Sequence, residues 1–245
     1  MVTTSLQQNT LQAYDAIAPL YAEYSEKYHN YLNSVDQLVI DRLSPGMRLL
    51  DVGSGDGRRL KKICDHHTLR DVVAIEPSGE MALLCRKTTG FTIYPIPGED
   101  LSTLQESSFD AITALWNVFG HMADSKARLK TLTAMAQKLK PGGKIMLDVN
   151  NRHNQLAYGK IKVIGRRLID AIFFDEKRGD AQFEWKIGNQ SFPASGHLFI
   201  PQEIELLFKQ AGLRVTERRS VHYSNGSVSS SPYNGQLFYV LQAAV

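Results

Sequence analysis

Cysteine is scarce in this chain of 245 residues, which contains Cys64 and Cys85 and no others. Two cysteines cannot form a multi-bridge framework and here they lack CxxC spacing, so we expect reduced, packed thiols in a cytoplasmic protein. Long apolar runs are also missing, since the most apolar window, residues 111–119, falls far short of the roughly 20 residues that span a bilayer. The first residues, MVTTSLQQNT, have neither a basic start nor an apolar stretch, so we predict no targeting segment and no membrane partner.

The chain also has little excess charge of either sign, because it contains 28 Lys and Arg and 25 Asp and Glu, which gives a net charge of +3. A nucleic-acid platform usually carries a larger excess, concentrated on one face. His66 and His67 are adjacent and cannot share a helix face at the spacing of a metalloprotease site, so we predict no metal. No GxSxG elbow is present, which argues against a serine hydrolase.

Short apolar runs alternate with helical patterns between residues 46 and 150. The runs that we interpret as strands are residues 48–52, 71–75, 91–96, 109–115 and 144–149. Several are almost wholly apolar, which is typical of parallel strands covered on both faces. Right-handed crossovers then predict a doubly wound α/β fold, whose ligand site lies at the carboxyl ends of the strands.

Two segments add to this predicted core. Residues 1–45 have helical spacing with a kink or break at Pro19, and we interpret them as an N-terminal lid. Residues 151–196 interrupt the alternation and include an antiparallel-strand pattern at 183–187. We interpret this segment as an insertion that covers the site.

The core resumes after the insertion, so that residues 46–150 and 197–245 form one doubly wound core. Together with the N-terminal lid and the insertion, this core makes the whole chain, residues 1–245, a single domain. Pro201 is a favourable first residue for a helix, and two closing strands follow that helix. The Ser-, Asn- and Gly-rich stretch 224–235 joins these strands and is predicted to be a mobile loop.

A glycine-rich loop, DVGSGDG at residues 51–57, lies between the first predicted strand and a helix. Its glycines allow a sharp turn and close approach of a ligand. The dinucleotide fingerprint would need glycine at position 58, which is Arg58, and Asp51 would repel a pyrophosphate. Glu76, at the end of the second strand, is placed to accept hydrogen bonds from both hydroxyls of a ribose. A ribose combined with a positively charged end indicates S-adenosylmethionine.

The sequence at this point resembles the class I S-adenosylmethionine-dependent methyltransferases of the small-molecule type. The matching motifs are LLDVGSGDG (49–57), AIEPSGEM (74–81), PGEDL (97–101), FDAITALWNVFGHM (109–122) and LKPGGKIMLDV (139–149). Five motifs in the right order are far more specific than one glycine loop. The resemblance implies a Rossmann-like, seven-stranded, mostly parallel sheet of order 3-2-1-4-5-7-6, with the last strand antiparallel and helices on both faces.

The resemblance also implies which residues hold the cofactor. Asp51, Gly53 and Gly55 would hold its methionine end and Glu76 its ribose. Glu99 or Asp100 would reach the adenine amino group, Met81 or Pro77 would pack on the ring, Leu115 and Trp116 would lie beside the methionine moiety, and Tyr14 or Tyr21 would close over it.

The chemistry needs little beyond positioning, because the methyl carbon of a sulfonium is already activated for in-line displacement. A base is needed where the acceptor is a hydroxyl or a protonated amine, and His121, in the loop after the fourth strand, is our candidate. A packing histidine is the alternative. The candidate acceptor-contacting residues are Tyr28, Asn117, Asn151 and Arg152.

We therefore predict transfer of a methyl group to an oxygen or nitrogen of a small-molecule acceptor, with release of S-adenosylhomocysteine and without a nucleic-acid partner. One alternative is an RNA methyltransferase that uses the basic residues Lys160, Lys162, Arg166 and Arg167 against phosphates. Another is a noncatalytic cofactor-binding or interaction module of the same fold. A homodimer through the aromatic insertion is left open.

Overall fold

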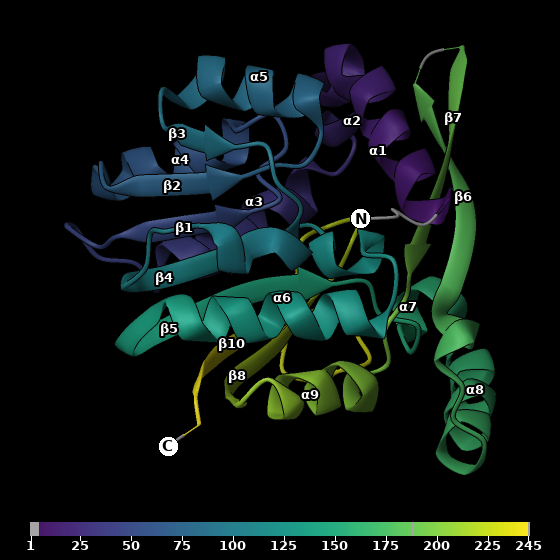
Figure 1. Cartoon of the computed structure of the whole chain (residues 1–245). Coiled ribbons are helices and arrows are strands. Elements are labelled where there is room, and N and C mark those ends of the chain that lie inside the picture. Colours follow the sequence, from purple (N-terminus) through teal and green to yellow (C-terminus); the bar gives the residue numbers. More distant parts are fainter. Residues whose placement is uncertain (1–4, 188, 245) are drawn as a thin grey trace.

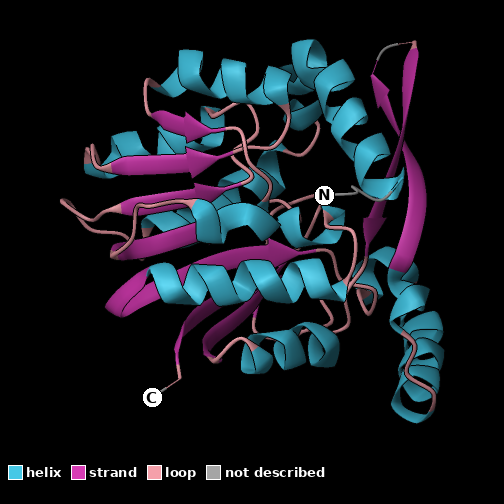
Figure 2. Cartoon of the chain, in the orientation of Figure 1, coloured by secondary structure: helices cyan, strands magenta, loops and turns pink. Residues whose placement is uncertain are grey.

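A twisted eight-stranded sheet forms the centre of the computed structural model, which describes residues 5–187 and 189–244 (Figures 1 and 2). In spatial order the strands are β3 (Thr92–Tyr94), β2 (Val72–Ile75), β1 (Leu49–Val52), β4 (Phe109–Ala114), β5 (Leu139–Val149), β10 (Gln236–Ala243), β8 (Leu213–Val221) and β9 (Val228–Ser229). The first five are parallel, and β10 runs antiparallel to both of its neighbours. The predicted order 3-2-1-4-5-7-6 is therefore confirmed.

The prediction of seven strands misses β9, which adds an eighth at the edge of the sheet. This strand falls within the stretch 224–235 that we expected to be a mobile loop. The segment is instead fixed by hydrogen bonds, since the Ser220 hydroxyl donates to the Ser231 carbonyl and the Asn151 amide donates to the carbonyls of Pro232 and Gly235. Asn151 is more than 80 residues away in the chain and Ser220 lies outside the stretch, so the composition of the stretch could not reveal these donors.

Helices cover both faces of the sheet, as predicted, because neighbouring residues of each strand point to opposite faces. On one face α3 (His29–Ile40), α4 (Arg58–His67) and α5 (Gly79–Thr89) pack on a core that includes Leu49. On the other face α6 (Ser125–Lys138), α9 (Pro201–Gln210) and η2 (Gly98–Thr103) pack on a core that includes Leu50. Cys64 and Cys85 are buried free thiols in the first of these cores, as predicted.

The N-terminal segment forms α1 (Ser5–Ile17), the 3₁₀ turn η1 (Ala18–Leu20) and α2 (Tyr21–Glu26). Pro19 lies in the 3₁₀ turn and separates the two helices, which confirms the predicted break. A third apolar cluster joins this segment to the rest of the chain. Its buried members are Ala13, Ile17, Ala18, Met81, Trp185 and Ala194.

The insertion contains α7 (Gln155–Tyr158), α8 (Lys160–Ile172), η4 (Glu176–Gly179) and an antiparallel hairpin of β6 (Asp180–Ile187) and β7 (Gln190–His197). Figure 1 shows the hairpin standing beyond the carboxyl ends of the parallel strands, beside α1. The antiparallel strand predicted at 183–187 is thus confirmed as part of β6. Among the described residues, no helix has the length and apolar character needed to cross a membrane.

Candidate functional site

The glycine loop leaves β1 at Val52 and turns through three residues in the left-handed region, Gly53, Gly55 and Gly57, with φ of 75°, 56° and 79°. Space is also restricted, because a Cβ on Gly53 would lie 2.7 Å from Val118 Cγ2. One on Gly57 would lie 2.8 Å from Cys85 Sγ. The loop can therefore be built only from glycine at these positions, and its backbone stays open toward a ligand.

Glu76 holds this loop in place from the end of β2. Its Oε2 accepts a hydrogen bond from the Gly55 N–H at 2.8 Å, and its Oε1 accepts one from the Ser78 N–H at 2.9 Å. Burial raises the pKa of the Glu76 carboxyl to about 7, against the opposing effect of these two hydrogen bonds. Each carboxylate oxygen has a further lone pair, so the side chain can also accept from two ligand hydroxyls.

Asp51 lies within β1, below the loop, and accepts a hydrogen bond from the Thr113 hydroxyl at 2.6 Å. Burial raises the pKa of its carboxyl, while the hydrogen bonds from Thr113 and Ser54 oppose that shift. A buried carboxylate in a cavity favours a cationic group there, because the cation offsets the cost of burying the charge.

Two cavities meet at the glycine loop. The α3-side cavity has a volume of about 250 Å³ and is lined by residues of α2, α3 and α4, together with Asp51. The α1-side cavity, of about 90 Å³, is lined by residues of α1, the loops after β2 and β3, and the loop after β4. Five residues line both: Tyr21, Gly53, Gly55, Leu115 and Trp116. The site is therefore one elongated space that bends over the loop.

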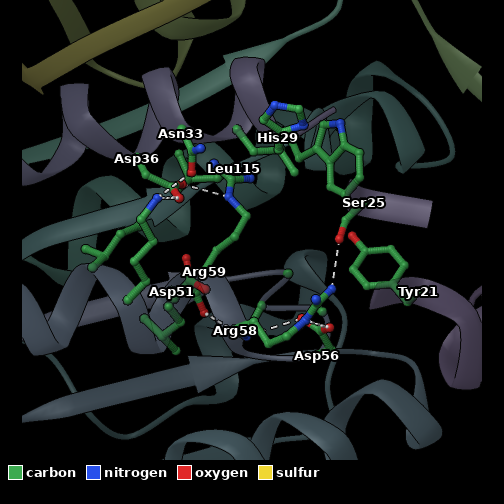
Figure 3. Close-up of a pocket in the computed structure, with 18 of the residues that line it drawn as sticks. Tyr21, Ser25, His29, Asn33, Asp36, Asp51, Asp56, Arg58, Arg59 and Leu115 are labelled. Carbon is green, nitrogen blue, oxygen red and sulfur yellow. Dashed lines mark hydrogen bonds and ion pairs between the residues drawn. The ribbon is translucent and has the colours of Figure 1, made fainter. Parts of the chain in front are cut away.

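Arg59 lines the α3-side cavity together with two other basic residues, Arg58 and Lys62. The Nε of Arg59 donates to Asp36 Oδ1 at 2.8 Å, and Figure 3 shows the two side chains pointing toward one another. Its Nη2 is buried and has no hydrogen-bond partner. A buried guanidinium nitrogen without a partner is costly, so it indicates a missing anionic or polar ligand atom. An α-carboxylate fits that position, and an α-amino group fits Asp51.

His121 lies at the end of the 3₁₀ turn η3 (Val118–His121), on the wall of the α1-side cavity. Its Nδ1 is 3.2 Å from the Ser195 carbonyl oxygen. Since a carbonyl can only accept, Nδ1 carries the proton and Nε2 keeps its lone pair. Burial lowers the pKa of the ring to about 4. The side chain is therefore a neutral imidazole that can accept a proton or a hydrogen bond at Nε2.

Aromatic rings enclose this part of the site. Tyr14 of α1 lies edge-on to His121, with ring centroids 5.5 Å apart, and packs on Trp185 of β6 at 4.8 Å. Trp116 packs against Tyr21 and Tyr24 of the N-terminal segment. The N-terminal segment and the insertion thus meet through ring contacts, and aromatic faces of this kind suit a sulfonium or an amine.

The backbone between β4 and η3 is strained, because Trp116 and Asn117 both have positive φ, at 70° and 61°. Asp148 of β5 supports this turn. Its Oδ1 accepts from the Trp116 N–H at 2.7 Å, and its Oδ2 accepts from the Tyr31 hydroxyl at 2.6 Å. The strain is therefore stored in the loop after β4, whose Leu115 and Trp116 line both cavities, and stored strain of this kind is typical of a functional site.

The structure brings together most of the residues predicted to bind the cofactor. Those that line the joined cavities are Tyr14, Tyr21, Asp51, Gly53, Gly55, Glu76, Pro77, Glu99, Leu115 and Trp116, together with the predicted base His121. Two predicted residues lie elsewhere. Met81 is fully buried in the cluster below α1, and Asp100 forms an ion pair with Lys130. Of each pair of alternatives, Pro77 and Glu99 are therefore the members at the cavity.

The predicted acceptor-contacting residues do not line either cavity. The Asn117 side chain accepts a hydrogen bond from the Asn150 N–H. The Asn151 side chain donates both of its hydrogen bonds to carbonyls of the 224–235 segment. Arg152 donates to both carboxylate oxygens of Asp170 at 2.9 Å. Tyr28 packs against Tyr24, Trp116 and Tyr223. These side chains have internal partners, so we correct their interpretation from acceptor contacts to support of the surrounding structure.

Sequence reasoning missed three charged residues of this region: Asp36, Arg59 and Asp148. Arg59 could have been found, because a cation in the first turn of a helix is placed against the helix dipole. Asp36 and Asp148 lie within apolar patterns of α3 and β5. A carboxylate in such a pattern signals a buried partner but does not identify it.

The strand order, the antiparallel β10, the glycine loop and the acid after β2 together define the Rossmann-like fold of class I methyltransferases, as the motifs implied. The sequence model of the methyltransferase domain matches residues 24–218, which is most of the chain. The chain therefore belongs to the methyltransferase family.

Two curated relatives differ in what their names say they act on. The ubiquinone biosynthesis O-methyltransferase of Xanthomonas axonopodis pv. citri (strain 306) is 32% identical over 159 residues, which cover 61% of this chain and 64% of that protein. The probable tRNA methyltransferase 9B of Homo sapiens is 25% identical over 203 residues, covering 80% of this chain and 40% of that protein. The chain thus spans less than two thirds of the length of these relatives.

Solved structures share the fold over nearly the whole chain. The CcbJ methyltransferase from Streptomyces caelestis superposes with a TM-score of 0.71 at 15% identity, covering 97% of this chain and 99% of that one. The DhpI-SAM-HEP complex gives a TM-score of 0.66 at 17% identity, covering 99% of this chain and 100% of that one. At these identities the similarity establishes the common fold.

Proposed function

We propose that this chain uses S-adenosylmethionine to methylate an oxygen or nitrogen of a small-molecule acceptor. The observation that carries the proposal is the joined pair of cavities around the glycine loop. Their polar groups match the parts of this cofactor, with Asp51 and Arg59 for the charged amino-acid end and Glu76 for the ribose. When bound, the cofactor supplies an electrophilic methyl group on a sulfonium.

The acceptor side of the site supports a compact substrate. Tyr14 and Trp185 close the space beside His121 from two separate segments of the chain. These contacts hold water away from the reacting groups and restrict the size of what can enter. His121 Nε2 would accept a hydrogen bond from the hydroxyl or amine of the acceptor and so orient its lone pair. For a hydroxyl acceptor, the proton becomes strongly acidic as the new O–C bond forms and the bond from carbon to sulfur breaks, and the same nitrogen would take it up.

The relatives are consistent with two acceptor classes. The ubiquinone relative is named for an O-methylation, which supports a small acceptor. The tRNA relative covers more of this chain. The candidate phosphate-binding residues Arg166 and Arg167 stack on Tyr158 and Tyr233, at 4.5 and 4.1 Å from the ring centroids. They therefore have internal roles, and we favour the small acceptor.

Ligand-induced stabilisation tests the cofactor. Ligand at 100 times its dissociation constant stabilises a protein by about 2.7 kcal/mol, which at this size raises the thermal midpoint by roughly 5–11 °C. We expect that shift with S-adenosylmethionine and S-adenosylhomocysteine but not with NAD. Glu76→Ala and Asp51→Asn should reduce it, whereas Glu80→Ala, which changes an exposed acid nearby, should keep it.

The shift should also depend on pH. Ribose hydroxyls donate to the ionised Glu76 carboxylate, whose pKa in the free protein is raised to about 7. As the pH falls through 7, the carboxyl takes up a proton and its ability to accept two hydrogen bonds is lost. At fixed ligand concentration we therefore expect a smaller shift at pH 6 than at pH 8. A shift with NAD alone, or one that Glu76→Ala leaves intact, would contradict the proposal.

Formation of S-adenosylhomocysteine then identifies the acceptor class. The protein is incubated with S-adenosylmethionine and, in separate reactions, phenols and catechols, primary and secondary amines, and unmodified tRNA. Turnover with a phenol, catechol or amine supports the proposal. Turnover with tRNA alone would overturn the small-molecule acceptor while leaving the cofactor assignment in place.

A further inference from the structure

Helix α8 presents large apolar side chains to solvent. Ile161 is 89% exposed, Leu168 62% and Ile172 70%, and the next two residues, Phe173 and Phe174, are 68% and 53% exposed. Figure 1 shows the helix at the end of the molecule that carries the hairpin, apart from the central sheet. A contiguous group of exposed apolar side chains of this size marks an interaction surface.

The apolar stripe is exposed along its length, and its middle residues Ile164 and Leu168 also line an open groove of about 630 Å³ beside Leu206 of α9. Ile161, Ile164, Leu168 and Ile172 follow one another at spacings of 3, 4 and 4 residues, so they share one face. The residues of this helix that are buried, Val163 and Asp170, lie on the opposite side. The amphipathic pattern is therefore inverted with respect to the protein core, since the charged Asp170 faces inward and the apolar stripe faces solvent.

Specific contacts hold the helix in this orientation. Asp170 is bound by Arg152 at 2.9 Å, by His153 at 2.9 Å and by Arg178 at 3.6 Å. Arg166 and Arg167 stack on aromatic rings of neighbouring segments. Rotation of the helix to bury its apolar stripe would break this network, so the exposure of the stripe is part of the folded structure.

The charges that α8 itself carries beside the stripe are positive. Lys160 lies on one side of it and Lys162 on the other, and both are exposed. The one acid of the helix, Asp170, is buried and paired. Two copies that met through this face would bring these cations together, which is unfavourable. An apolar stripe with cations along both sides instead complements acyl chains and anionic headgroups.

We propose that α8 docks the protein on an anionic lipid surface, with the Ile161–Ile172 stripe inserted at the boundary of headgroups and acyl chains and Lys160 and Lys162 at the level of the phosphates. The sequence led us to expect no membrane partner, but that expectation considered only segments that span a bilayer. Docking of this kind needs no such segment and is independent of the proposed methyltransferase activity.

Co-sedimentation of the full chain with vesicles tests the proposal. We expect the protein to pellet with vesicles of phosphatidylcholine and phosphatidylglycerol, weakly with phosphatidylcholine alone, and less as salt rises. The double substitution I161Q/L168Q should lower the partition coefficient at least tenfold. K160Q/K162Q should lower it about five-fold for each lysine removed, which corresponds to about 1 kcal/mol each.

The matched control is L83Q/K87Q on α5, where Leu83 is 57% exposed and Lys87 lies one turn away. This control should pellet as the unchanged protein does. All these positions are exposed, so the thermal midpoints should stay within a few degrees and exclude unfolding as the cause. The proposal fails if anionic vesicles do not pellet the protein, or if I161Q/L168Q leaves pelleting unchanged. It also fails if that substitution instead abolishes self-association measured by sedimentation velocity without lipid.

Discussion

His121 illustrates how much the role of a residue depends on its surroundings. An imidazole has an ordinary pKa near 6.5, and in water it would be partly protonated at neutral pH. Burial among Tyr14, Trp185 and Phe183 lowers the pKa to about 4, and the Ser195 carbonyl fixes the proton on Nδ1. The same residue is thereby converted from a pH-sensitive group into a neutral hydrogen-bond acceptor with a defined lone pair.

Replacing His121 by Asn tests the roles of its two ring nitrogens separately. The Asn amide can still donate to the Ser195 carbonyl, as Nδ1 does, but it has nothing in place of Nε2. We expect kcat to fall by about 10²–10⁴ with little change in KM for the cofactor, because proton acceptance is lost while the fold is kept. For the unchanged enzyme at saturating cofactor, we expect His121 to cause no change in kcat near pH 6.5, because burial lowers the pKa of its ring to about 4. A variant with normal kcat would restrict His121 to packing.

At the scale of elements, the site is closed by segments that lie far apart in the chain. Helix α1 packs on the hairpin β6–β7 and on α5, so the lid is held from both sides. Trp185 is the centre of this arrangement, since its ring contacts Tyr14, Tyr24 and His121 and it is 6% exposed. The lid and the insertion thus act on the site together.

Trp185→Ala should loosen this closure without unfolding the core. It removes ring contacts that hold α1 against the hairpin, so hydrogen–deuterium exchange should become faster in α1 and β6–β7 while β1, β4 and β5 keep their protection. KM for the cofactor should rise, because α1 and the hairpin would then have to become ordered when the cofactor binds. Glu184→Ala is the matched control, since Glu184 is the neighbouring residue on the same strand and its side chain is exposed. Equal exchange in both variants would show that Trp185 does not hold the lid.

The whole molecule is stabilised by two cores, one on each face of the sheet. The sheet passes between them, and consecutive residues such as Leu237 and Phe238 of β10 contribute to opposite cores. Phe208 of α9 is fully buried in the core on the α6 and α9 face and packs on Tyr239, with ring centroids 5.1 Å apart. Stability therefore depends on the sheet and its helices, and the site at the strand ends can carry strain.

Phe208→Ala should lower the free energy of unfolding by about 3–5 kcal/mol, the cost of a cavity in place of a buried ring. Val215→Ala, on β8, should change it by less than about 0.5 kcal/mol, because Val215 is 37% exposed. Urea denaturation followed by circular dichroism measures both values. A small effect of Phe208→Ala would mean that α9 contributes little to the folding unit.

The sequence by itself determined the parallel core, because the period and apolarity of its strands and the glycine turns are local properties. It also singled out Asp51, Gly53, Gly55 and Glu76, which the structure places around the two cavities. Tertiary structure alone decided which partners the remaining polar residues have. Arg152 is paired with Asp170, and Arg59 points to Asp36 and the cavity, since such pairs join distant residues. Whether an apolar stripe such as that of α8 faces a core or solvent is likewise set by what packs against it.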